Sequence, residues 1–140
     1  MTDLALPSHT PIAHPSRLLR RALGVDAALS LLSGLLMAID AAPLNVVLGL
    51  PNDLLRGVGL ALLPWAEVVG WLATRPTVMR RAVWAVIGLN ALWTLDCLGL
   101  LVSGVVAPTE LGTAFVIVQA LVVLALAEAQ WLGLRRSVAD

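Results

Sequence analysis

The sequence predicts an all-α fold: an integral membrane bundle of four transmembrane helices with both termini cytoplasmic. Composition is the first observation, because 59% of the 140 residues are hydrophobic and only 13% are charged. Soluble domains are about 45–50% apolar, and the mean hydropathy here is +0.92. The second observation is the presence of four long apolar segments, since roughly 20 such residues cross a hydrocarbon core of about 30 Å. Lipid is therefore expected to cover much of the surface.

The third observation is the distribution of arginine, which supplies every basic residue. In the four-span topology one side carries all but one of them: Arg17, Arg20, Arg21, Arg75, Arg80, Arg81, Arg135 and Arg136. Only Arg56 lies on the other side. The positive-inside rule then predicts that both termini are cytoplasmic.

The expected domain organisation is a tail, a membrane domain and a second tail. Residues 1–16 contain three prolines and no apolar period, so a flexible N-terminal tail is predicted. Its two histidines, His9 and His14, are interpreted as solvated, because a metal site needs further ligands nearby. Residues 17–136 form the four-helix transmembrane domain, and 137–140 form the C-terminal tail. The helices are predicted at residues 18–42, 53–74, 82–106 and 111–134.

A signal peptide is the alternative interpretation of the first predicted helix, because basic residues precede an apolar core. Asp40, however, lies where a cleavage site requires small neutral residues. We therefore expect a true span. The connector at 42–52 is apolar in its middle, so it is expected to lie in the interface or to dip into the membrane.

The second predicted helix begins after Pro51, and Pro64 is expected to kink it by removing a backbone hydrogen bond. A short basic loop leads to the third helix, and Pro108-Thr109-Glu110 turns the chain into the fourth.

Two of the predicted helices carry a polar face. On the first helix the spacing is four, three, four and three residues, at Asp26, Ser30, Ser33, Met37 and Asp40. This spacing places the five residues on one side of an α-helix. The second helix has a comparable face at Asp53, Arg56, Leu60, Pro64, Glu67, Trp71 and Thr74. Polar faces inside a membrane are expected to meet other helices, water or a ligand.

Depth in the membrane groups the polar residues into layers. An inner layer lies seven to nine residues from the cytoplasmic arginines, about 10–14 Å at the rise of an α-helix, and contains Asp26, Glu67, Asn90 and Glu128. A second layer near the middle of the membrane contains Ser33, Asp96 and Gln119. Near the outer surface Asp40 and Arg56 share a depth, and we predict that they form a structural ion pair.

The inner layer suggests a proton-binding or cation-binding site lined by Asp26, Glu67, Asn90 and Asp96. Two carboxylates facing each other without a basic partner are costly to ionise together, so such a site would exchange a proton or bind a cationic ligand. Trp93 lies deeper than the other tryptophans and is the expected pocket wall. Trp65, Trp71, Trp84 and Trp131 are assigned to an interfacial aromatic belt.

The alternative interpretation of these residues is structural. Serine and asparagine in membrane helices often join neighbouring helices at about 0.6 kcal/mol per contact. Asp26 would then be solvated near the interface, and Glu128, which lies off the polar face of its helix, would extend to the cytoplasm.

Several classes of function are disfavoured. The sequence has no Walker loop, dinucleotide fingerprint or HExxH motif, and Cys97 is the only cysteine. We therefore expect no enzymatic activity, no cofactor and no metal. The net charge of zero gives no indication of nucleic-acid binding.

Three segments, LLRGVGLALLPWAEVVGWLATRP, VWAVIGLNALW and PTELGTAFVIVQALVVLALAEAQWLGLRR, resemble a group of small bacterial four-span integral membrane proteins without an assigned activity. The resemblance covers Arg17 to Arg136 and implies the fold and a bacterial inner-membrane location. In size and span number the chain is also similar to small multidrug-resistance transporters. Asp26 would take the place of their membrane-embedded glutamate, although their surrounding sequence pattern is missing here.

Two functional hypotheses remain open. In the first, the chain is a small membrane protein that binds or transports a proton, a cation or a small cationic ligand through the inner layer, as a homo-oligomer. In the second, it is a non-catalytic accessory or scaffold subunit of a larger membrane complex. The lipid bilayer is the expected surrounding in both.

Overall fold

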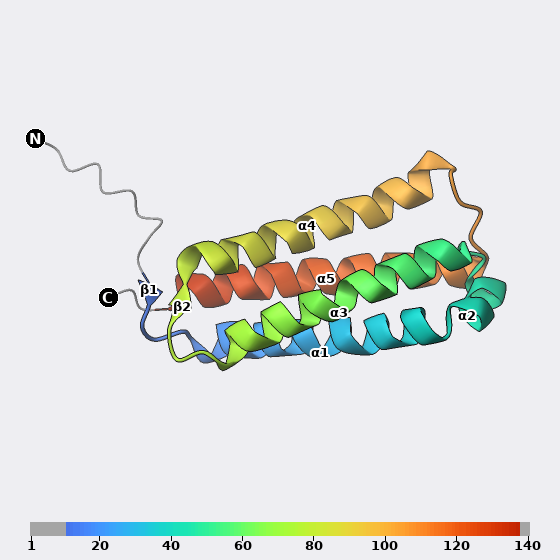
Figure 1. Ribbon diagram of the computed structural model, residues 1–140. Coiled ribbons are helices and arrows are strands. Elements are labelled where there is room, and N and C mark those ends of the chain that lie inside the picture. The colour runs from blue at the N-terminus through green and yellow to red at the C-terminus, as the bar shows by residue number, and fades with distance from the viewer. Residues whose placement is uncertain (1–10, 138–140) are drawn as a thin grey trace, which may run out of the picture.

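The computed structural model describes residues 11–137, and within this range it is an all-α bundle (Figure 1). Its helices are α1 (Arg17–Ile39), α2 (Ala41–Leu48), α3 (Asn52–Thr74), α4 (Arg80–Ser103) and α5 (Glu110–Arg135). Two short strands, β1 (Pro11–Ile12) and β2 (Val78–Met79), form an antiparallel pair. The helices α1, α3, α4 and α5 are each long and apolar enough to cross a membrane. The predicted fold class is confirmed.

The connector between the first two spans is helical, which the sequence analysis did not predict. The first span ends at Ile39 rather than at residue 42, and α2 begins directly after Asp40. Gly49 ends α2 with a φ of 67°, a left-handed conformation that glycine adopts without steric cost. Gly104, with a φ of 72°, likewise ends α4 three residues before the predicted boundary.

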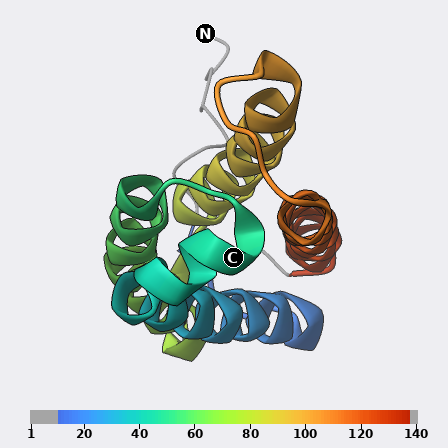
Figure 2. The ribbon, with the colours of Figure 1, turned by 90° about the vertical axis from the view of Figure 1, so that its right-hand side faces the viewer.

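The four long helices are not equally packed against one another. Helix α1 packs along α3, α4 packs along α5, and α1 also packs against α5. By contrast, the backbones of α3 and α4 make few close approaches, although side chains of both helices share one apolar cluster. Figure 2 shows the C-terminal end of α4 standing apart from α3. The bundle is therefore closed on three sides, and its least closed side lies between α3 and α4.

A close helix contact joins α1 to α3 through two glycines. A Cβ atom on Gly59 would lie 2.5 Å from the backbone nitrogen of Ala38 and 2.8 Å from the carbonyl oxygen of Gly34. A Cβ atom on Gly34 would lie 3.0 Å from the carbonyl oxygen of Gly59. Small residues permit this backbone approach, which is a common way of packing membrane helices.

Both ends of the bundle are fastened by side-chain hydrogen bonds. At the end where α1 begins, the Ser16 hydroxyl accepts from the Leu19 amide and donates to the Gly133 carbonyl at 2.6 Å. At the other end, Thr109 caps α5 and donates its hydroxyl to the Val47 carbonyl at 2.8 Å. The arginines at positions 17, 75, 80 and 135 lie at one end of the bundle, where α1 and α4 begin and α3 and α5 end (Figure 1).

The last part of the predicted flexible tail is packed. Ile12 is fully buried and belongs to the same apolar cluster as Val78, its partner in the strand pair. The prediction missed this contact because two-residue strands leave no periodic signal in the sequence. Residues 1–10, including His9, and the C-terminal residues 138–140 lie outside the described residues.

We predict that Gly59→Ala destabilises the bundle by about 1–3 kcal/mol, because the added methyl group overlaps the α1 backbone. Gly57→Ala is the matched control. A Cβ atom at Gly57 meets nothing within 4 Å, so better helix propensity should raise stability by up to about 1 kcal/mol. The free energy of unfolding in mixed detergent micelles tests both variants. Equal effects of the two substitutions would contradict the close α1–α3 contact.

Candidate functional site

The centre of the bundle holds a buried carboxylate. Asp26 on α1 is 3% exposed. Its Oδ2 atom accepts hydrogen bonds from Asn90 Nδ2 on α4 and from Gln130 Nε2 on α5, both at 2.7 Å. Its Oδ1 atom accepts a longer hydrogen bond, of 3.3 Å, from the Ser30 hydroxyl one turn along α1. One carboxyl group thus joins three helices.

The two amide side chains around Asp26 also contact each other. Asn90 Nδ2 lies 3.2 Å from Gln130 Oε1, and Gln130 is fully buried. One turn further along α4, the Thr94 hydroxyl donates to the Asn90 carbonyl at 3.1 Å. The same hydroxyl lies 3.4 Å from the Ala120 carbonyl on α5. This polar cluster, defined as Asp26, Ser30, Asn90, Thr94 and Gln130, fixes the position of the carboxylate.

All donors to Asp26 in the described part of the chain are neutral. Amide and hydroxyl groups stabilise an ionised carboxylate by hydrogen bonding but do not cancel its charge. A carboxylate has about four acceptor positions, and three are used here. The Oδ1 atom, with one long hydrogen bond, has room for a further donor.

A cavity of about 420 Å³ lies beside the polar cluster and is bounded by all four long helices. Asp26, Ser30 and Asn90 form part of its wall. Most of the remaining wall is apolar, with aromatic surface from Trp65, Trp93 and Phe115. No lysine, arginine or histidine lines it among the described residues. It is a partly open, apolar and aromatic-lined cavity with a buried carboxylate in its wall.

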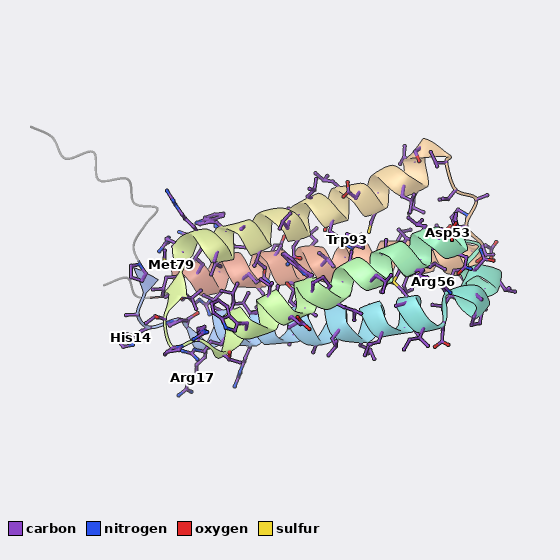
Figure 3. All side chains as sticks on the ribbon, in the orientation of Figure 1. His14, Arg17, Asp53, Arg56, Met79 and Trp93 are labelled. Carbon is purple, nitrogen blue, oxygen red and sulfur yellow. The ribbon has the colours of Figure 1, made fainter. Side chains whose placement is uncertain are left out.

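The middle layer predicted from the sequence meets at this cavity. Ser33 from α1, Asp96 from α4 and Gln119 from α5 all line it. Asp96 and Gln119 also line an adjoining cavity of about 260 Å³, and Trp93 and Phe115 border both spaces. The expected wall residue Trp93 therefore lies where the two cavities meet, on α4 (Figure 3).

The structure unites Asp26, Asn90, Asp96 and Trp93 at one cavity but not Glu67. Glu67 is exposed and lines neither cavity, because its neighbour Ala66 is the buried residue at this level of α3. Successive residues point about 100° apart on a helix. Trp65, expected in the aromatic belt, instead faces the cavity from α3. Glu128 is also exposed.

The predicted ion pair between Asp40 and Arg56 is not formed. Both side chains are exposed, and the described residues show no salt bridge between them. Asp40 lies at the break between α1 and α2, where its backbone makes the end contacts of both helices. On α3, Leu55 and Gly59 are buried, so Arg56 points outward near the end of the bundle where α3 begins (Figure 3).

Gln130 is the site residue that the sequence analysis did not select. The inner layer was assigned by depth alone, which selected Glu128 rather than Gln130, two residues later on the same helix. The signal that identifies Gln130 is angular, because it shares the polar face of α5 with Gln119 eleven residues earlier, about three turns of helix. Direction around the helix is more informative here than depth.

Three of the tryptophans predicted to form an aromatic belt, Trp71, Trp84 and Trp131, are exposed. Arg75 stacks over Trp71 with its guanidinium carbon 4.1 Å from the ring centroid, and Arg135 lies 5.0 Å from the Trp131 ring. These pairs are typical of a membrane–water boundary.

Comparison with known proteins adds no further constraint: no family model, curated protein or solved structure matches this chain.

We predict that Gln130→Met destabilises the protein by about 1–3 kcal/mol, because it removes a donor from a buried carboxylate while conserving volume. Gln119→Met is the control: it lies on the same face, with no hydrogen bond of its side chain recorded among the described residues, and should cost less. In an Asp26→Leu background the cost of Gln130→Met should shrink, as a double-mutant cycle of unfolding free energies would show. Additive costs would contradict the direct Asp26–Gln130 bond.

Proposed function

We propose that this chain is a multi-pass protein of the bacterial inner membrane that binds a cation, either a proton or a small cationic ligand, at Asp26. Both termini would face the cytoplasm, in accord with the arginine distribution. The observation that carries the proposal is the buried Asp26 carboxylate, which borders a large cavity and has only neutral donors.

The energetic argument concerns the charge of Asp26. An ionised carboxylate in an apolar surrounding is costly unless hydrogen bonds and an opposite charge stabilise it. The polar cluster supplies the hydrogen bonds, and the cavity leaves space for the opposite charge. A proton on Asp26 would also remove the cost, so proton and cationic ligand compete for one group.

The aromatic wall favours an organic cation among the possible ligands. Trp65, Trp93 and Phe115 border the space beside Asp26. The faces of such rings attract cations, with a contribution of about 2 kcal/mol or more when water is excluded. A small inorganic ion would leave most of the apolar wall without contact.

We predict that the protein in lipid nanodiscs binds hexylamine and that Asp26→Asn lowers this affinity at least tenfold. Isothermal titration calorimetry measures the affinity of each protein for hexylamine.

Glu67→Gln is the matched control for this experiment, because Glu67 lies on a membrane helix but lines neither cavity. It should bind hexylamine as the unmodified chain does. Hexanol, the neutral analogue, should bind less tightly than hexylamine. Equal affinities for the amine and the alcohol would show that Asp26 does not act through its charge.

A second candidate function is that of an accessory or scaffold subunit, and the outward face of α3 favours it. All seven residues of the α3 polar face, from Asp53 to Thr74, are exposed. Glu67 on this face lies within a membrane-spanning helix, where contact of a carboxylate with lipid is costly. A second copy of this chain or another membrane protein would cover the face.

We predict that a cysteine at position 67, introduced as Glu67→Cys in a Cys97→Ser background, gives a disulfide or bifunctional cross-link in native membranes. Val25→Cys is the control, since Val25 is exposed on α1 at a similar depth from the arginine end. A product of twice the chain mass would indicate a homo-oligomer, and a different mass would indicate a larger complex. Equal cross-linking at both positions would contradict a specific α3 interface.

A further inference from the structure

A second carboxylate, Asp96, lies at the rim of the Asp26 cavity. It lines both cavities and is exposed. Thr94, whose hydroxyl approaches Ala120 on α5, is about 160° from Asp96 around α4. Asp96 therefore points away from α5, toward the side where the backbones of α3 and α4 make few close approaches. The cavity has one acid at its base and another at this open side.

Neither acid has a positive partner in the described part of the chain. Asp96 lies seven residues before the last residue of α4, within a helix that is long and apolar enough to cross a membrane, and an uncompensated carboxylate inside the membrane is costly. Among the residues that the structure describes, none that lines the cavity is basic. Charge complementarity thus favours an occupant with two positive charges rather than one.

The separation of the two acids indicates the shape of that occupant. Asn90, which donates to Asp26, is six residues before Asp96 on α4, about 9 Å along the helix axis. Trp93 lies between these levels and faces the cavity, opposite apolar residues such as Leu62 on α3. The part of the cavity between the two carboxylates is therefore lined by apolar and aromatic side chains.

We propose that the cavity binds a linear amphipathic diamine, with one ammonium group at Asp26, the other at Asp96 and an apolar spacer along Trp93. This inference rests on the proposed cation binding at Asp26 and adds a second point of attachment. Hexamethylenediamine is a suitable probe, because an extended chain of single bonds of about 1.5 Å has a comparable length. The open side between α3 and α4 would admit it from the membrane.

The test compares hexamethylenediamine, hexylamine and ethylenediamine by isothermal titration calorimetry on the full chain in nanodiscs. We expect the longer diamine to bind at least tenfold more tightly than hexylamine. Ethylenediamine, too short to reach both acids, should gain nothing over hexylamine. Asp96→Asn should abolish the advantage of the diamine over hexylamine when both affinities are measured on the same variant. Because Asp96 is exposed, this variant is expected to fold.

Each outcome separates this inference from the proposed function. Hexylamine binding that depends on Asp26, together with no advantage for the diamine, would overturn the two-point site but support cation binding. Failure of both amines to bind would overturn both proposals and would fit a cavity filled by a helix of another subunit. A diamine advantage that survives Asp96→Asn but is lost in Glu67→Gln would place the second contact on α3 and contradict the role of Asp96.

Discussion

The burial of one carboxylate is the constraint on which the arrangement of the bundle depends. Asp26 is excluded from solvent inside an apolar protein, so it requires hydrogen-bond donors from its neighbours. Asn90 and Gln130 supply them from two other helices. These bonds bring α1, α4 and α5 into a common register. The amide pair also fixes how α4 and α5 are rotated, since each amide must point at the same carboxylate oxygen.

Helix α3 takes no part in these hydrogen bonds and is held by packing instead. Gly34 and Gly59 bring its backbone close to α1, while its contacts with α4 are sparse. The cavity arises because hydrogen bonds join α1, α4 and α5 to one another but not to α3. On one side of the polar cluster α5 closes the space, and on the other side the space stays partly open between α3 and α4. The bulky rings of Trp65 and Trp93 border the space without filling it. The same rotation of α3 that presents Gly59 to α1 turns Arg56 and Glu67 outward.

The polar cluster also explains why the cavity is a candidate site rather than a packing irregularity. An apolar void would be stable without polar groups in its wall. Here a buried carboxylate is retained at the cost of two further buried amides, Asn90 and Gln130. Three apolar residues could pack this region without that cost. Asp96, the second acid that lines the cavity, adds to the negative charge of Asp26, and the cavity also has aromatic side chains in its wall.

The sequence by itself determined the membrane class, the four spans and the inward direction of the first polar face, because hydropathy and helical period are local properties. It also placed Asp26 and Asn90 at one depth, and Asp96 beside Ser33 and Gln119, since depth follows from counting residues. Only the tertiary structure decided the rotation of each helix about its own axis. Because of that rotation, Trp65 rather than Glu67 lines the cavity, and Gln130 rather than Glu128 donates to the Asp26 carboxylate. Asp40 and Arg56, predicted to pair, form no salt bridge with each other among the described residues. A wide arc of each helix is apolar enough to face either lipid or protein, so the choice is made by close packing at glycines and by hydrogen bonds between helices, neither of which is local in sequence.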